Sequence, residues 1–374
     1  MSEYGLLLAS ALVSAVVNLL GLARRGPVRR ILVVKLDHLG DVITATPALQ
    51  ALREAHPEAE IDLLMAPSVA PLFEGLPFLT RVRTYDSPRY RRAGGDARRR
   101  RSPPIPAGAR YDVVVELRGD ARTLLLPFQV GATRRLDRGT ARLRDWIGRR
   151  LHPARPPLHE VEANLAIVQP LLGGRASAAG ARVQVHVPDA ARASLARRHA
   201  EAGVSADRPV VALHPGASWA PRAWLPERFA AIADWIEAHY DAQVVIMGSA
   251  GERDVEAAVR SHARGSALSW FGTLSIAEAG ALLQRCRLLI GNDGGIAHLA
   301  AACGTPVAAL FGPQDPRRFR PWAERVVALH HRVPCFPCSQ VRCVRPELPC
   351  VNLIEIAEVE AAARALLGPP PLRS

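Results

Sequence analysis

The hydrophobic positions of this chain fall into short apolar runs that alternate with longer segments of helical periodicity. Runs such as Arg30–Lys35 (RILVVK), Tyr111–Leu117 (YDVVVEL) and Gln243–Met247 (QVVIM) are rich in valine, leucine and isoleucine. Between them, segments such as Asp41–His56 and Pro226–Tyr240 repeat apolar residues at the spacing of a helix. Apolar strands separated by helices are typical of buried parallel sheets in an α/β fold.

This alternation occurs twice, which predicts two Rossmann-like domains, each a doubly wound parallel sheet, facing one another across a cleft. The 374 residues are enough for two domains of ordinary size. We expect an N-terminal domain at 28–178 and a C-terminal domain at 182–350, joined by a glycine-rich linker and followed by a helix and tail at 351–374. Ligands of such sheets bind beyond the carboxyl ends of the strands, so the turns that follow strands are the candidate sites.

Residues 1–25 form a separate hydrophobic segment. Gly5–Ala23 contains no charged side chain, and its polar side chains are Ser10, Ser14 and Asn18. As a helix it would extend about 28 Å, close to the hydrocarbon thickness of a bilayer. Arginines follow it directly, which predicts a membrane anchor with the rest of the chain in the cytoplasm. A helix docked on the protein is the alternative.

The formal net charge of +13 at pH 7 changes this picture little. Lys35 is the single lysine, and much of the arginine excess lies between Arg89 and Arg101. Glycine and proline flank this run, so we predict a mobile basic loop at 87–109. No aromatic residues are interleaved in a way that would stack bases, and a nucleic-acid partner rests on charge alone. An anionic membrane surface is compatible with the same charge.

The first candidate turn follows the strand Arg30–Lys35 and reads Lys35-Leu36-Asp37-His38-Leu39-Gly40-Asp41. Gly40 lets a ligand approach the backbone closely. Asp41 begins the next helix, where a carboxylate can cap the helix or accept a proton from a ligand. From the residues alone, the N-cap is the simpler interpretation. Lys35 and Gly40 are the further candidates on this side of the site.

Three turns of the second series offer backbone N–H groups and side chains to phosphates. The turn His214–Ser218 ends in the Ser218 hydroxyl, and Arg222 follows as a guanidinium that can grip a diphosphate with two donors. In the next turn, Glu252 is a candidate for ribose hydroxyls, although glutamate often begins a helix for dipole reasons alone. The last turn runs through a glycine pair into a helix and contains Asp293, Gly294, Gly295 and His298.

Taken in order, these segments resemble glycosyltransferase family 9, the ADP-heptose:lipopolysaccharide heptosyltransferases. The matching segments are RRILVVKLDHLGDVITATPAL, YDVVVELRG, HPGASWAPRAWLPERFA and LIGNDGGIAHLAAACGTPVAALFGPQDP. They extend over about Arg29 to Leu366, and Asn292–Pro316 is the most specific part. The resemblance implies a GT-B fold and inverting, metal-free transfer of a heptose or related sugar from an ADP-sugar to an acceptor hydroxyl in lipopolysaccharide core or related surface-glycan synthesis.

The resemblance also implies roles for single residues. Asp41 matches the general base of the family, and Ser218 and Arg222 match positions that hold the diphosphate. The residues that match the nucleotide-sugar contacts are Asp293, Gly294, Gly295 and His298. Arg222 stands where heptosyltransferases often carry lysine, and Gly294 stands where many carry threonine, so the identity of the donor is left open.

The expected partners are a nucleotide sugar, a glycolipid acceptor and the inner surface of the cytoplasmic membrane, and the expected state is a monomer that requires no cofactor. Two alternatives remain from the residues. A sugar-nucleotide epimerase of similar shape would need further acid–base residues in the cleft. A non-catalytic protein that binds nucleotide sugars or glycolipids would keep the donor turns but would not require Asp41.

Four cysteines lie within a short stretch near the C-terminus: Cys335, Cys338, Cys343 and Cys350. Two pairs of thiols can hold a tetrahedral zinc ion, which makes these residues candidates for a structural metal site. The second spacing is wider than in common zinc ribbons, and a cysteine-rich packed loop is the alternative. A disulfide is not expected in a reducing cytoplasm.

Overall fold

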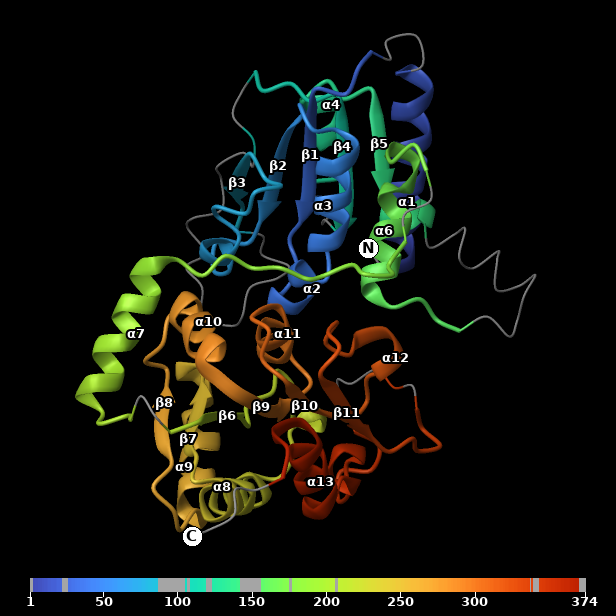
Figure 1. Ribbon diagram of the computed structural model, residues 1–374. Helices are drawn as coiled ribbons and strands as arrows, with labels where there is room; N and C mark the ends of the chain where they lie inside the picture. Colours follow the sequence, from blue (N-terminus) through green and yellow to red (C-terminus); the bar gives the residue numbers. More distant parts are fainter. Residues whose placement is uncertain are drawn as a thin grey trace. The chain divides into compact units, whose positions relative to one another are not determined.

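The computed structural model describes residues 3–21, 26–86, 105, 108–118, 123–141, 156–174, 177–205, 208–336, 338 and 343–369. The chain divides into two compact units, Met1–His186 and Val187–Ser374, each built on one parallel sheet (Figure 1). The division falls just after the predicted linker. The basic run 89–101, with most of the loop predicted at 87–109, lies outside the described residues.

The first unit contains a five-stranded sheet in the order β3-β2-β1-β4-β5. Its strands are β1 (Arg30–Lys35), β2 (Glu60–Met65), β3 (Arg81–Thr84), β4 (Val113–Arg118) and β5 (Arg134–Asp137). The three central strands are buried almost throughout, as the apolar runs predict. The direction in which strands are added reverses between β1 and β4. Sheets of this kind bind ligands beyond the carboxyl ends of the strands at such a reversal.

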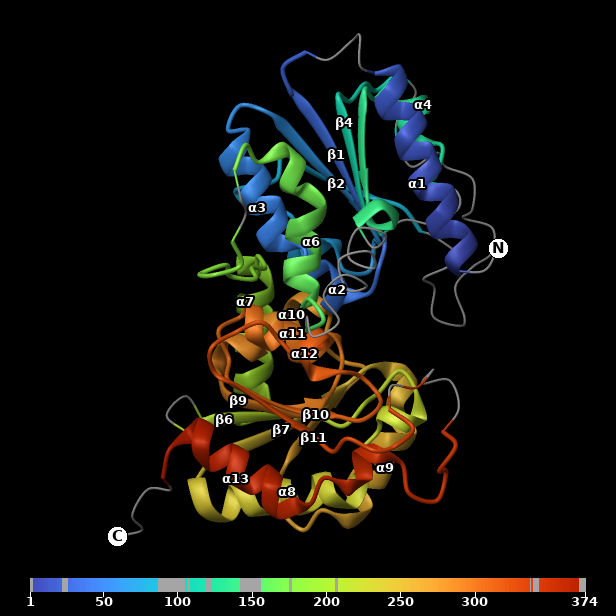
Figure 2. The same ribbon diagram turned by 90° about the vertical axis from the view of Figure 1, so that its right-hand side faces the viewer.

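Helices α3 (Thr46–Ala55) and α6 (Glu160–Val168) lie on one face of this sheet, and α1 (Glu3–Leu20) lies on the other (Figure 2). The helix predicted at 41–56 is interrupted, because α2 (Leu39–Ile43) ends before α3 begins. Pro47 explains the break. Its ring would clash with the carbonyl four residues earlier in a continuous helix, whereas it is well tolerated in the first turn of α3.

The helix predicted near 69–76 is reduced to the single 3-10 turn η2 (Ala70–Leu72), which has Pro71 at its centre. The edge strands β5 and β11 (Val326–His330) and the helix α7 (Asp189–Glu201) were not predicted. The four-residue helices α4 (Leu126–Gln129) and α12 (Pro316–Phe319) were not predicted either. The two strands lie at sheet edges, where the continuous apolar runs of central strands are not required.

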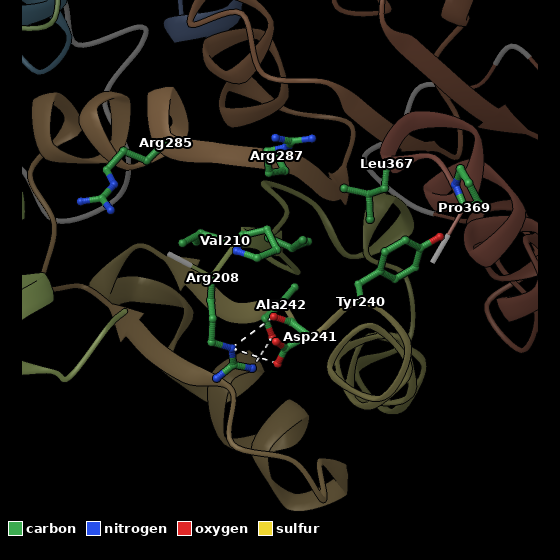
Figure 3. Close-up of a pocket in the computed structure, with 11 residues that line it drawn as sticks. Arg208, Val210, Tyr240, Asp241, Ala242, Arg285, Arg287, Leu367 and Pro369 are labelled. Carbon is green, nitrogen blue, oxygen red and sulfur yellow. Dashed lines mark hydrogen bonds and ion pairs between the residues drawn. The ribbon is translucent and has the colours of Figure 1, made fainter. Parts of the chain in front are cut away.

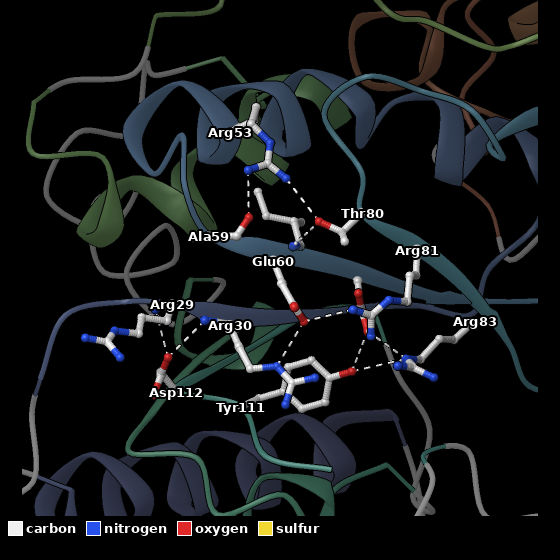
Figure 4. Close-up of polar contacts among 12 residues, drawn as sticks. Arg29, Arg30, Arg53, Ala59, Glu60, Thr80, Arg81, Arg83, Tyr111 and Asp112 are labelled. Carbon is white, nitrogen blue, oxygen red and sulfur yellow. Dashed lines mark hydrogen bonds and ion pairs between the residues drawn. The ribbon is translucent and has the colours of Figure 1, made fainter.

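Ion pairs cover the β2 and β3 part of the face on which α1 lies (Figure 4). Oδ2 of the buried Asp62 accepts hydrogen bonds from Nε of Arg83 at 2.7 Å and from Oη of Tyr111 at 2.6 Å. Glu60 pairs with Arg81 at 3.0 Å beside them. Burial and the hydrogen bond to Asp62 raise the pKa of Tyr111 to about 12, so this phenol stays protonated as a donor.

The second unit contains a six-stranded parallel sheet in the order β11-β10-β9-β6-β7-β8. Its strands, besides β11, are β6 (Val210–His214), β7 (Gln243–Gly248), β8 (Leu268–Phe271), β9 (Cys286–Asn292) and β10 (Val307–Phe311). The predicted strands of the second series are all present, within two residues at each end. Here the reversal of strand order lies between β6 and β9, which again marks the expected ligand position.

Both faces of this second sheet carry helices (Figure 2). Helices α8 (Pro226–Tyr240), α9 (Arg253–His262) and α13 (Ile356–Leu367) lie on one face, and α10 (Ile276–Arg285) and α11 (Gly295–Ala302) lie on the other. The C-terminal helix predicted within 351–374 is α13. Its Val359, Ala363 and Leu366 are buried in the core of the unit, so it is an integral part of this layer.

Helix α1 forms from the hydrophobic segment and packs along β5. Among the residues that the structure describes, no helix is long and apolar enough to cross a bilayer. The three polar side chains of the segment bond to β5, which corresponds to the docked alternative.

Candidate active site

A buried ion pair lies in the turn after β1. Lys35 ends this strand with no exposed surface, and its Nζ lies 2.7 Å from Oδ2 of Asp37. Oδ1 of Asp37 lies 3.2 Å from Nε of Arg118, the last residue of β4. The carboxylate of Asp37 therefore joins β1 to β4 at the place where the strand order reverses. The sequence pattern did not single out Asp37 or Arg118, although each lies at the end of an apolar run.

Asp41 lies beside this ion pair, in the first turn of α2 and partly exposed. The helix begins at Leu39 with His38 as its N-cap residue, so Asp41 is not the N-cap, and the simpler interpretation from the residues was wrong. Its backbone oxygen accepts a hydrogen bond from Oγ1 of Thr44 at 3.0 Å. Its carboxylate belongs to the helical turn that directly follows β1, as a group that acts at the switch point requires.

The surroundings of Asp41 favour its protonated form. Burial raises the pKa of the Asp41 carboxyl, and the negative charges of Asp37 and Glu160 raise it further, while Lys35 and Arg118 lower it. The net effect is a pKa above the ordinary value of an aspartate. A carboxylate with a raised pKa is a stronger proton acceptor than a fully solvated one, which suits a general base.

Helix α6 fixes the position of α2. Nδ2 of the buried Asn164 donates to the backbone oxygen of Thr44 at 3.2 Å, directly after α2. Glu160 begins α6 and accepts from Nη2 of Arg138 at 2.5 Å. The start of α6 is held by a capping box between His159 and Glu162. The charge of Glu160 near Asp41 thus comes from a well-anchored helix end.

The two other residues predicted on the acceptor side, Gly40 and Lys35, are buried next to Asp41. Gly40 is a buried residue of α2, and Lys35 is completely buried in its pair with Asp37. Gly40 precedes Asp41 in the backbone of α2, and Lys35 holds the charged Asp37 near it. Direct contact of either residue with an acceptor stays a prediction.

In the second unit, Asn292 ties together the turns that follow β6 and β9. Its Nδ2 donates to the backbone oxygen of Pro215 at 2.7 Å, and its Oδ1 accepts from the backbone N–H of Trp224 at 3.1 Å. The side chain is buried, so these bonds are shielded from water. Asn292 therefore fixes the turn after β6 and the approach to α8 as one body. The sequence pattern placed Asn292 in the right turn without assigning it this role.

Arg222 and Asp293 lie together at this junction. Nη1 of Arg222 is 3.4 Å from Oδ2 of Asp293, and both side chains are largely buried. The guanidinium of Arg222 also stacks over the ring of Trp219, 4.8 Å from its centroid, and the Trp219 side chain is 42% exposed. The predicted diphosphate clamp is thus held on two sides, which lowers the entropy it would lose on binding an anion.

Glu252 packs against the same turn. Its Oε2 accepts from the backbone N–H of Ser249 at 2.7 Å and from Oγ of Ser249 at 2.6 Å, as the cap of the turn η6 (Ala250–Glu252). A Cβ on Gly216 would lie 2.2 Å from Oε1 of Glu252, so a side chain there would displace the Glu252 carboxylate. The observed contacts of Glu252 are therefore structural, and its predicted bond to a ribose stays a prediction.

The remaining donor-side residues surround the same edge of the sheet. Ser218 is exposed in the turn after β6. Gly294 and Gly295 are partly exposed at the start of α11, where backbone N–H groups lack helical partners. His298 is buried on the second turn of α11. Ser218, Arg222, Asp293 and the glycine pair thus gather beyond β6 and β9, whereas His298 lies deeper.

A pocket of about 590 Å³ in this unit lies elsewhere (Figure 3). Its lining includes Arg208 and Val210 at the start of β6, Asp241 before β7, and Arg287 near the start of β9. These residues mark the amino edge of the sheet, opposite to the donor turns. Nε of Arg208 pairs with Asp241 at 3.2 Å within it. The pocket is therefore not the place where the predicted donor residues meet.

Two doubly wound parallel sheets, with the candidate donor turns gathered beyond the switch point of the second, define an α/β protein of the GT-B type. A sequence profile of glycosyltransferase family 9 (heptosyltransferase) matches residues 107–348. The chain therefore belongs to glycosyltransferase family 9. This confirms the family inferred from the sequence segments and the assignment of the chain as a glycosyltransferase.

Known proteins agree with this assignment. Lipopolysaccharide heptosyltransferase 3 of Escherichia coli is 25% identical over 297 residues, which cover 77% of this chain and 85% of that protein. The solved structure of the glycosyl transferase family 9 from Veillonella parvula DSM 2008 has a TM-score of 0.72 at 20% identity, over 91% of this chain and 97% of that one. Escherichia coli ADP-heptose lps heptosyltransferase II has a TM-score of 0.63 at 20% identity, over 90% and 98%.

The four C-terminal cysteines, Cys335, Cys338, Cys343 and Cys350, are free thiols. Burial, followed by the other three cysteines, raises the pKa of Cys350. Within the described ranges, no three His, Cys, Asp or Glu side chains converge where they could hold a metal ion. The predicted zinc site thus gains no support.

A structure with the same fold, the iron-containing heptosyltransferase TibC, has a TM-score of 0.53 at 13% identity, over 91% of this chain and 76% of that one.

Proposed function

We propose that this glycosyltransferase transfers a heptose or related sugar from an ADP-sugar to a hydroxyl of a glycolipid acceptor, with inversion, in lipopolysaccharide core or related surface-glycan synthesis. Two observations carry the proposal: the Asp41 carboxyl, which has a raised pKa at the switch point of the first sheet, and the Arg222–Asp293 pair at the switch point of the second sheet. Known relatives named as lipopolysaccharide and ADP-heptose heptosyltransferases support the choice of donor and acceptor.

The second unit holds the diphosphate in this proposal. Arg222 donates to its oxygens, and the backbone N–H groups that begin α11 and the Ser218 hydroxyl add further donors. These donors neutralise the charge that builds up on the departing ADP, so no catalytic metal is required by the proposed chemistry. The chain's own contribution is a set of donors fixed in advance by Asn292 and Trp219.

The first unit supplies the base. Ionised Asp41 takes the proton of the acceptor hydroxyl as the hydroxyl oxygen attacks the anomeric carbon from the side opposite to the diphosphate. The new glycosidic bond forms while the bond from the anomeric carbon to the diphosphate oxygen breaks, and its electron pair leaves with ADP. One backside displacement inverts the anomeric configuration. Asp41 ends protonated and returns its proton to water.

The acceptor also defines where the enzyme acts. A glycolipid is held in a membrane, so the proposal places the chain at the cytoplasmic face of the inner membrane, where ADP-sugars are available. The acceptor's lipid part stays in the bilayer, and the reacting hydroxyl is presented in the head-group region.

A donor panel tests the proposal. The purified full-length chain is offered ADP-heptose, ADP-glucose and a uridine diphosphate sugar, each with and without a lipopolysaccharide-core acceptor, and free nucleoside diphosphate and coupled product are measured. We expect acceptor-dependent release of ADP with the ADP-sugar. Binding without turnover would instead support the non-catalytic alternative, and a changed sugar configuration on intact nucleotide would support the epimerase.

The charges of Asp37 and Arg118 are expected to shift the acid limb of the pH–rate profile, which Asp41 sets. Transfer requires ionised Asp41, so the rate falls as the pH drops through its raised pKa. Asp37 raises that pKa and Arg118 lowers it. Asp37→Asn should therefore move the acid limb to lower pH, and Arg118→Gln should move it to higher pH. The measurement is kcat against pH for both variants.

Opposite shifts of the acid limb in the two variants would indicate an electrostatic effect. A general disturbance of the structure would not move the limb in opposite directions according to the charge removed. Limbs that stay in place, or that move in the same direction, would exclude Asp41 as the group that titrates. A Glu58→Gln variant is the matched control, because this exposed carboxylate lies away from Asp41 in sequence and is not among the groups that shift its pKa.

A further inference from the structure

Helix α1 has its polarity reversed relative to an ordinary surface helix. Its polar side chains face the protein, where Oγ of Ser14 donates to Oδ2 of Asp137 at 2.5 Å. Asn18 exchanges two hydrogen bonds of 2.9 Å with the backbone of Arg135 in β5. Ser10 donates to Asp137 at 3.1 Å. The recurrence of polar residues every four positions thus serves the contact with β5 and not the contact with water.

The opposite side of α1 is apolar and exposed. The exposed fractions are 67% for Leu12, 39% for Val16, 68% for Leu19 and 66% for Leu20. At about 100° per residue these four positions span an arc of about 100°, which lies opposite to the arc of Ser10, Ser14 and Asn18. A helix that only closed the protein surface would present its polar arc outward.

The exposed apolar surface continues beyond the C-terminal end of α1. Gly21 packs against the backbone of Thr133, and the preceding Ala132 donates its N–H to the backbone oxygen of Pro127 in α4 (Leu126–Gln129) at 2.8 Å. In and next to α4, Leu125 is 56% exposed and Phe128 is 45% exposed. We call these six side chains, Leu12, Val16, Leu19, Leu20, Leu125 and Phe128, the α1 surface.

Arginines lie at the same edge of the first sheet as this end of the α1 surface. Arg29 and Arg110 are exposed, and Arg134 begins β5, one residue after the contact of Thr133 with Gly21. Figure 4 shows the Arg29 side chain pointing away from the ion pairs around Glu60. Exposed leucine and phenylalanine next to guanidinium groups match the apolar and anionic layers of a lipid head-group region.

We propose that the α1 surface docks on an anionic lipid bilayer, with α1 lying in the plane of the interface and Arg29, Arg110 and Arg134 on lipid phosphates. The identity of this partner rests on the proposed function, because a glycolipid acceptor is held in a membrane. A second copy of the chain fits less well, since a symmetric contact through this surface would bring the arginines of both copies together.

Vesicle binding tests the proposal on the full-length protein, without donor or acceptor. Co-sedimentation is measured with phosphatidylcholine vesicles that contain or lack phosphatidylglycerol. We expect binding to the anionic vesicles that weakens as salt is added. The triple variant Leu12→Gln/Leu19→Gln/Leu20→Gln should bind at least about tenfold more weakly. The variant Arg29→Gln/Arg110→Gln should lose about fivefold per arginine on anionic vesicles only.

The matched control is Val344→Gln/Leu348→Gln, which removes two exposed apolar side chains from the second unit and should leave binding unchanged. Thermal unfolding shows whether each variant is folded. If the leucine variant does not fold, vesicle binding by the arginine variant tests the proposal. The proposal would be overturned if the wild-type chain did not bind, or if both surface variants bound anionic vesicles as tightly as wild type. So would a wild-type dimer that the leucine variant converts to monomer. Sugar transfer is absent from this assay, so failure of the proposed function is recognised separately.

Discussion

Replacing Asp41 by asparagine is expected to lower kcat for sugar transfer by about 10²–10⁴-fold, the usual contribution of a general base. The dissociation constant for ADP should stay unchanged, because the donor turns lie in the second unit, around Arg222 and Asp293. The amide has the shape of the carboxyl group but cannot accept the proton. The measurements are kcat from ADP release with saturating acceptor, and the affinity for ADP by calorimetry.

Stability separates a catalytic role of Asp41 from a structural one. The raised pKa means that the folded chain holds the Asp41 carboxylate less favourably than the unfolded chain does, at any pH where the group is ionised. Asp41→Asn removes that cost, so its free energy of unfolding at pH 7 should equal or exceed the wild-type value. Normal turnover in Asp41→Asn would exclude it as the base. A folded protein of lower stability would point to a structural role.

Replacing Arg222 by alanine is expected to weaken ADP binding by about 10–100-fold, the effect of losing charge-assisted hydrogen bonds to a diphosphate. We expect the upper end of this range. Without Arg222, the negative charge of Asp293 is no longer balanced by the guanidinium 3.4 Å away and repels the diphosphate. Titration calorimetry of ADP into the purified variant measures the change directly.

Two further variants make this result specific. Arg222→Lys keeps the charge but loses the planar pair of donors and the stacking on Trp219, so its ADP affinity should lie between wild type and Arg222→Ala. Arg260→Ala is the matched control, because this arginine is 64% exposed on α9 and pairs only weakly with Glu256, at 3.7 Å. An ADP dissociation constant that does not change in Arg222→Ala would remove Arg222 from the donor site.

The central strands could be predicted because burial on both faces leaves a continuous apolar run. The limits of this signal are visible in one pentapeptide. VVALH forms β6 at Val210–His214 and β11 at Val326–His330, but only the first was predicted. The central copy is buried in four of its five positions, and the edge copy is half-buried throughout. Whether a strand is central or at the edge depends on contacts with residues distant in sequence, which the five residues themselves do not determine.

The edge strand β5 was missed for a different reason. Its sequence is Arg-Arg-Leu-Asp, which has the composition of a surface loop. In the fold, Arg135 is completely buried, pairs with Glu116 of β4 and donates hydrogen bonds to Ser10 and Ser14 of α1. A strand held by buried ion pairs and by a helix more than a hundred residues away leaves no hydrophobic pattern to detect.

The turns of the candidate site were predicted from their position after strands, and the structure brings Ser218, Arg222 and Asp293 to one edge of the second sheet. Their role in binding the donor stays a prediction. The residues that fix these groups were not predicted. Asp37 and Asn292 each act through partners that are distant in sequence, Arg118 for the first and Pro215 for the second. Position after a strand identifies candidates for chemistry, whereas the supports of those candidates become visible only in the folded chain.

Strand β5 forms one border of the first sheet, and a border strand offers unpaired N–H and C=O groups to any strand that can reach it. Asn18 occupies both of these groups at Arg135 with its own amide. Helix α1 thereby prevents a strand of another molecule from pairing with β5. A chain shortened by this helix would leave that border open, and copies of it would be prone to assemble through their sheets.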